Sequence, residues 1–118
     1  MHHYKIAAIP GDGIGTEVIA AGVEVLEALA KRDSSFAFQF DHFDWGGEYF
    51  KKHGRMMPEN GRDQIRHHDA ILFGSAGHPD IPDHITLWGL RLAICQPFDQ
   101  YANVRPTRVL PGITSPLR

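Results

Sequence analysis

The sequence feature that most constrains the fold is the stretch from Tyr4 to Val18, where a short apolar run meets three alternating glycines and then a helical pattern. This order predicts a strand, a tight turn and a helix. Glycines at 11, 13 and 15 permit backbone dihedrals closed to other residues, and free N–H groups at a helix start attract negative charge. The turn is a candidate cradle for an anionic or nucleotide ligand. A plain glycine-rich turn is the alternative, because Thr16 stands where the dinucleotide fingerprint has its third glycine.

Length and composition bound the class of protein. The 118 residues allow one small domain, and 42% hydrophobic with 22% charged residues is an ordinary soluble globular composition. A formal net charge of -2 offers no basic field for nucleic acid or for a membrane surface. The apolar run at residues 6–9 is too short for a signal peptide or a membrane span, so the expected location is cytoplasmic. Cys95, the single cysteine, is expected as a small buried residue of a helix.

Hydrophobic periodicity predicts alternating strands and helices. We expect strands over residues 4–9, 36–43 and 69–74, and helices over 17–31, 46–54, 58–68 and 85–93. Thr16 is the expected N-cap of the first helix. Residues 101–110 are expected to be extended, since Pro106 biases Arg105 toward β geometry. Buried strands that alternate with helices indicate an α/β fold whose mostly parallel sheet is covered on both faces by flanking helices.

Residues 74–84 form the expected loop at the carboxyl end of the third strand, the edge where open α/β sheets bind ligands. Arg91 and Arg105 flank this edge, and two converging guanidiniums would hold a dicarboxylate bidentately. The alternative is that both are surface arginines in local ion pairs.

Other polar residues give weaker signals. The loop carries imidazoles and carboxylates suited to zinc or iron, but their spacing matches no known metal motif, so a solvated polar loop is preferred: His78, Asp80, Asp83 and His84. His67 and His68 are adjacent and therefore poor co-ligands. Asp41 and Asp44 lie beyond the offset of about 20 residues at which dinucleotide folds place their ribose-binding acid, and neither is assigned that role.

Taken together, the motifs resemble the isocitrate and isopropylmalate dehydrogenase family. The resemblance lies in residues 10–15 with Glu17-Val18, in Gly74-Ser-Ala-Gly77, and in Leu90-Arg91 followed by residues 101–106. The segment 83–106 is similar to the tartrate dehydrogenase and decarboxylating D-malate dehydrogenase branch. The resemblance implies that residues 1–118 are the N-terminal part of the large, cofactor-side domain of an isopropylmalate-dehydrogenase-like fold, which they leave incomplete.

The resemblance implies an oxidoreductase that oxidises a 2-hydroxy dicarboxylate with NAD and Mg²⁺ or Mn²⁺, with decarboxylation, and that is a homodimer at full length. The metal would act as a Lewis acid on the hydroxyl and the new carbonyl. Arg91 and Arg105 would bind the substrate carboxylates, and Ile14 would lie near the adenosine. The nicotinamide and its ribose would be bordered by Gly74, Ser75, Ala76, Gly77 and Leu87.

The family's catalytic tyrosine and lysine, its metal-binding aspartates and a further arginine have no counterpart here. No catalytic residue and no metal ligand is therefore expected in the chain, since no family ligand position matches Asp12, Asp41, Asp44, Asp80, Asp83 or Asp99. We expect the 118 residues alone to be inactive, and to be marginally stable or to oligomerise, because their sheet is incompletely covered. Two alternatives stay open: a stand-alone nucleotide- or anion-binding module without catalysis, and a truncated product with no independent role.

Overall fold

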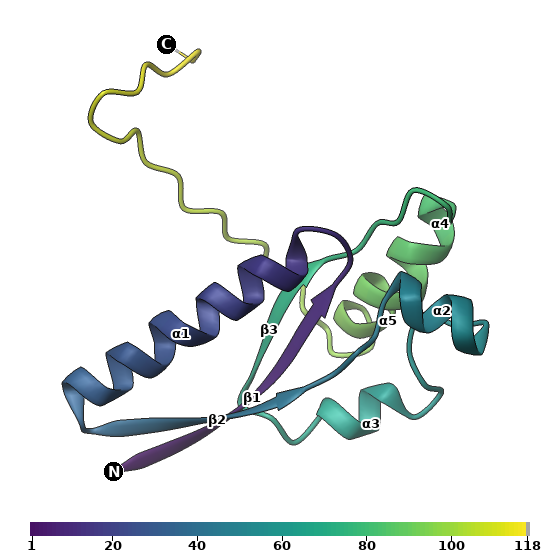
Figure 1. Ribbon diagram of the computed structural model, residues 1–118, viewed down its shortest axis with the longest axis horizontal. Helices are drawn as coiled ribbons and strands as arrows, with labels where there is room; N and C mark the ends of the chain where they lie inside the picture. The colour runs from purple at the N-terminus through teal and green to yellow at the C-terminus, as the bar shows by residue number, and fades with distance from the viewer. Residues whose placement is uncertain (118) are drawn as a thin grey trace.

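The computed structural model describes residues 1–117 and shows an α/β arrangement (Figure 1). Its strands are β1 (His2–Gly11), β2 (Phe36–His42) and β3 (Ala70–Ser75). Its helical elements are α1 (Gly15–Asp33), α2 (Gly47–His53), α3 (Gly61–Ile65), α4 (Asp83–Thr86), the π-helical segment η1 (Leu87–Arg91) and α5 (Leu92–Cys95). Residues 96–117 contain neither helix nor strand.

The three strands form one parallel sheet in the order β2-β1-β3. The central strand β1 is paired on both sides, and Ile6 lies opposite Phe40 of β2 and Ala70 of β3. Residues 6–9 of β1 are all buried, as a continuous apolar run in a parallel sheet requires. The predicted α/β class with a parallel sheet is therefore confirmed.

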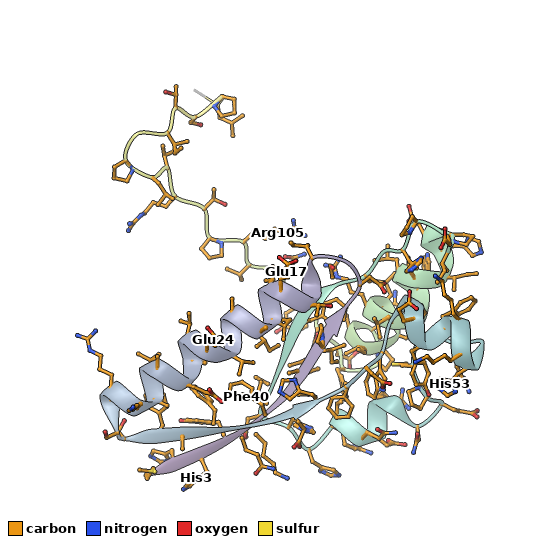
Figure 2. The ribbon with its side chains drawn as sticks, viewed as in Figure 1. His3, Glu17, Glu24, Phe40, His53 and Arg105 are labelled. Carbon is orange, nitrogen blue, oxygen red and sulfur yellow. The ribbon has the colours of Figure 1, made fainter. Side chains whose placement is uncertain are left out.

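One face of the sheet packs against α1. A side chain added at Gly22 of α1 would meet Leu72 of β3, which lies opposite Ala8 in the register. Ile6 and Phe40 share this face, and Figure 2 shows Phe40 between β2 and α1. The alternating phenylalanines 36, 38 and 40 form a row with ring centroids 5.4 and 5.8 Å apart, the first pair T-shaped and the second tilted. The aromatic stripe of β2 is thus packing surface for α1.

The opposite face carries the main core. Ala7 and Ile9 of β1 are fully buried there, together with residues from the segments that follow β2 and β3: Trp45, Met56, Ile65, Leu90 and Ile94. Ile71 and Phe73 of β3 pack against the same cluster. The two faces are therefore covered by different parts of the chain, α1 on one side and the elements from α2 to α5 on the other (Figure 1).

Several predicted boundaries were wrong. Thr16 is not an N-cap: α1 begins at Gly15 after Ile14, and no side chain caps it. The helix expected over 58–68 is only the five residues of α3, and the single helix expected over 85–93 is divided by η1. Residues 101–110 form no strand and are exposed. Among residues 1–117, no helix has the length and apolarity that crossing a bilayer requires.

Candidate functional site

The carboxyl ends of β1 and β3 lie side by side, but the chain leaves them toward opposite faces of the sheet. After β1 it enters α1 on one face, and after β3 it enters α4, η1 and α5 on the other (Figure 1). In open α/β sheets this divergence marks the crevice in which ligands bind. The turn at residues 11–15 and the loop from Gly74 onward are therefore the structural candidates for a binding site.

The glycine turn packs directly on the end of β3. Gly11 has a φ of 70°, and a Cβ there would overlap the Ser75 carbonyl oxygen. A Cβ on Gly74 would overlap the Pro10 carbonyl oxygen and would lie 2.9 Å from the Gly15 Cα. Gly11 and Gly74 are thus required by the close approach of two backbone segments. From the sequence, the close approach of a ligand was the expected reason for the glycines of the turn.

Asp12 joins three segments of this edge, and sequence reasoning missed it. Its side chain is buried, with Oδ1 accepting the Gly47 N–H at 2.7 Å and Oδ2 accepting the Gly77 N–H at 3.0 Å. Its backbone N–H donates to the Ser75 carbonyl at 2.7 Å, and the Ser75 hydroxyl donates to the Asp12 carbonyl. The glycine turn, the loop after β3 and the start of α2 are therefore held together by one residue.

This network argues against the turn as a general anion cradle. The Gly15 N–H already donates to the Asp12 carbonyl at 3.0 Å, and the Thr16 N–H donates to Gly13 at 3.4 Å. A phosphate at the turn would also meet the negative Asp12 carboxylate. The observation weakens the alternative of a stand-alone anion-binding module.

The residues predicted to border a nicotinamide cofactor lie along this edge in three segments. Residues 74–76 end β3 and are half-buried, Gly77 is exposed, and Ile14 in the turn after β1 is 63% exposed. Leu87 is half-buried in η1, on the element that follows the loop. Nothing lies within 4 Å of where a Cβ of Gly77 would stand. The loop therefore offers accessible backbone to a flat ligand group.

The two arginines occupy different surroundings. Arg91, the last residue of η1, lines an open cavity of about 810 Å³ with residues of α5 and of the segment 96–104. Arg105 lies one residue beyond that lining, on the extended segment shown in Figure 2, and its Nε donates to Asn103 Oδ1 at 3.2 Å. Cys95, expected to be buried, is half-buried and lines the same cavity. Arg91 is therefore placed at a cavity, whereas Arg105 is placed beside it.

The irregular helix sets where Arg91 points. The Leu92 N–H donates to the Leu87 carbonyl, a hydrogen bond from residue i+5 to residue i that defines the π segment. Leu90 is fully buried and Arg91 is exposed. Segments of this type recur at functional sites because they redirect the side chains that follow.

A polar cluster fixes the outer part of the loop to α2. His78 Nε2 lies 3.1 Å from Glu48 Oε1, and Lys51 Nζ lies 3.3 Å from Asp80 Oδ2 and 3.4 Å from the same Glu48 oxygen. Hydrogen bonds from His78 and Lys51 lower the pKa of Glu48, and the hydrogen bond to Asp80 raises the pKa of Lys51. Among residues 1–117, no three histidine, cysteine or acidic side chains are grouped to hold a metal ion. The cluster is therefore a set of ion pairs between α2 and the loop.

Known proteins match this chain in sequence. The sequence profile of the family described as isocitrate/isopropylmalate dehydrogenase matches residues 5–118. A probable tartrate dehydrogenase/decarboxylase of Agrobacterium vitis is 68% identical over 118 residues, which are 100% of this chain and 32% of that protein. The decarboxylating D-malate dehydrogenase of Escherichia coli is 50% identical over 119 residues, covering 99% of this chain and 33% of that protein. The chain thus spans about one third of the length of these relatives.

A solved structure shows the same fold. The apo crystal structure of a β-decarboxylating dehydrogenase from Thermococcus kodakarensis matches with a TM-score of 0.66 and 34% sequence identity, over 83% of this chain and 27% of that one. The parallel sheet, the glycine turn at its carboxyl edge and the family profile along nearly all of the sequence lead to one conclusion. The chain belongs to the isocitrate/isopropylmalate dehydrogenase family.

Proposed function

We propose that this chain is the N-terminal part of a dehydrogenase of the tartrate and D-malate type, which oxidises and decarboxylates a 2-hydroxy dicarboxylate with NAD and Mg²⁺ or Mn²⁺. The observation that carries the proposal is the placement of Arg91 at an open cavity, on an element that follows β3, in a chain that the family profile matches along nearly all of its length. The high identity to a probable tartrate dehydrogenase/decarboxylase supports the same substrate class. The proposal includes a cytoplasmic homodimer, and it treats the 118 residues alone as inactive.

In this proposal the described residues bind the cofactor and the hydroxy acid and orient them relative to each other. NAD, when bound, would supply the acceptor for the hydride that leaves the carbinol carbon of the substrate. The exposed backbone at Gly77 and the half-buried residues 74–76 fit the nicotinamide and its ribose, because the lack of a side chain at Gly77 leaves room for the flat nicotinamide ring. Ile14 is exposed on the adjacent turn and fits the adenosine side. The metal ligands would come from residues outside this chain, as the resemblance to the family implies.

Arg91 and Arg105 would hold substrate carboxylates in charge-assisted hydrogen bonds. Arg91 belongs to η1 and Arg105 to the extended segment, and in this proposal each would bind its own end of a dicarboxylate. Holding both ends fixes the carbinol carbon relative to the cofactor, and orientation of this kind accounts for a large part of enzymatic rate enhancement.

The test is a kinetic comparison of Arg91→Gln and Arg91→Lys in the protein expressed from its complete reading frame. A charge-assisted hydrogen bond contributes about 1.5–3 kcal/mol, so Arg91→Gln should raise KM for the hydroxy acid roughly 10- to 100-fold. Arg91→Lys should raise this KM less, because lysine keeps the positive charge and loses only the bidentate hydrogen bonding of the guanidinium. KM for NAD should stay within about twofold of wild type in both variants.

The matched control is Arg62→Gln, which removes an exposed arginine of α3 on the core side of the sheet. This variant should keep wild-type kinetics. If Arg91→Gln left KM for every tested 2-hydroxy dicarboxylate unchanged, Arg91 would not bind the substrate, and the proposed use of the cavity would be wrong.

A further inference from the structure

The carboxylate of Asp12 is buried, and both of its oxygens accept hydrogen bonds from distant parts of the chain. It is 4% exposed, and each carboxylate oxygen accepts one backbone N–H, from Gly47 and from Gly77. These glycines lie 35 and 65 residues further along the chain. A buried carboxylate is costly unless hydrogen bonds replace its water, so the two amides and the carboxylate depend on one another.

Gly47 and Gly77 lie in two segments that contact each other, the start of α2 and the loop after β3. Gly47 is the first residue of α2, and no other acceptor for its N–H is found in the described part of the chain. A Cβ at Gly47 would lie 2.7 Å from the His78 ring, so α2 and the loop are in direct contact there. The ion pairs of Glu48 with His78 and of Lys51 with Asp80 lie further out and are exposed, so they are screened by solvent. The buried Asp12 carboxylate is thus the principal fixed link at the base of the loop.

We infer that Asp12 is a positioning residue for cofactor binding: its carboxylate fixes the loop Gly74–Gly77 to the glycine turn and to α2, so that the loop is ordered before NAD arrives. This inference rests on the proposed function, in which the loop borders the nicotinamide ribose. Preorganisation of a loop improves affinity because its ordering cost is paid before binding. Arg91 belongs to a different element, so the hydroxy acid should depend on Asp12 far less than NAD does.

The first arm of the test is amide hydrogen exchange, which needs no turnover. In the wild-type protein, the Gly47 and Gly77 amides should exchange at least tenfold more slowly than the amide of Gly13, for which the described residues provide no acceptor. Asp12→Asn should accelerate exchange at one or both glycines at least tenfold, because the amide nitrogen of asparagine cannot accept a hydrogen bond. The matched control, Asp44→Asn, changes an exposed carboxylate just before α2 and should leave both rates unchanged.

The second arm is steady-state kinetics of the same two variants. Asp12→Asn should raise KM for NAD at least tenfold and change KM for the hydroxy acid less than threefold, a split that a general loss of stability would not produce. Rapid exchange at Gly47 and Gly77 in the wild type would overturn the inference even if Asp12→Asn could not be purified. Accelerated exchange with an unchanged KM for NAD would also overturn it, and would leave Asp12 a purely structural link.

The two arms separate this inference from the proposed function. If the wild-type protein oxidised no 2-hydroxy acid with NAD, the proposed function would fail in the wild type itself. The inferred cofactor role of Asp12 would fail with it, while the exchange arm would still decide whether Asp12 fixes the loop.

Discussion

The imidazole of His68 lies between two groups that only accept hydrogen bonds. Nδ1 is 3.2 Å from the Ile65 carbonyl oxygen, and Nε2 is 2.8 Å from Asp41 Oδ2. A carbonyl oxygen and a carboxylate oxygen both accept hydrogen bonds, so an acceptor lies within reach of each ring nitrogen. The His68 side chain is 7% exposed, and its hydrogen bond lowers the pKa of the Asp41 carboxyl below its usual value. The pair joins β2 to the turn that precedes β3.

This pKa shift predicts the sign of a pH effect. A carboxyl whose pKa is lowered by folding stabilises the folded state above its unfolded pKa, near 3.8, and loses that contribution as pH falls through the folded value. Asp41→Asn should therefore reduce resistance to urea at pH 7, and the difference from wild type should shrink as the pH falls below 3.8.

Tryptophan fluorescence follows this unfolding, since the buried Trp45 lies beside Phe43, whose ring also contacts His68. The exposed Asp44→Asn change serves as the control and should not alter the urea midpoint. If Asp41→Asn lowered the urea midpoint by the same amount at every pH, the ion pair with His68 would not be the cause of the lost stability.

At the residue scale, the sequence predicts features that depend on a local motif. The spacing of glycines and apolar runs was enough to predict the glycine turn and the loop from Gly74. It assigned no role to Asp12, Asp41 or His68, because their partners lie 27 to 65 residues away in the sequence. Only the parallel pairing of the strands brings these groups together, and no single-sequence pattern encodes that pairing.

At the scale of elements, the C-terminal end of α1 carries a strained residue. Ser34 follows the helix with φ of 63°, and its N–H closes the last turn by donating to the Ala30 carbonyl. This left-handed position favours glycine, because other residues meet a steric cost of about 1 kcal/mol. The Ser34 hydroxyl partly offsets the cost by donating to the Lys31 carbonyl at 3.2 Å.

Ser34→Gly should therefore stabilise the protein by roughly 0.5–1 kcal/mol, seen as a rise of about 1 to 3 °C in the thermal midpoint. Ser34→Val is the opposing variant and should lower the midpoint, since a β-branched residue tolerates positive φ poorly. A midpoint that fell with glycine and rose with valine would show that Ser34 is not held in the left-handed conformation.

Strands and the long helix were predictable because their apolar periodicity is strong, and each was confirmed with boundaries that differ by at most two residues. The helix expected over 85–93 was less predictable. Leu90 and Ile94 are buried four residues apart, as in any helix, so the pattern carries no sign of the wider turn at Leu87–Arg91. The wider turn depends on how the helix packs against the rest of the fold, and hydrophobic periodicity does not reveal it.

At the scale of the whole molecule, the described residues leave apolar surface uncovered. Val18, Val25 and Leu29 of α1 are about half exposed or more, and β3 is an edge strand with no further partner among residues 1–117. The sheet is therefore open on the side of β3. The expectation that the 118 residues by themselves are marginally stable or associate stays a prediction.

We propose that the protein carrying this chain oxidises and decarboxylates tartrate or D-malate with NAD. The most direct measurement is the absorbance of NADH formed by the purified product of the complete reading frame, with NAD, Mn²⁺ and each acid in turn. We expect NADH with tartrate or D-malate, one CO₂ released per NADH from D-malate, and loss of both signals when EDTA removes the metal. A folded protein that formed no NADH from either acid would contradict it.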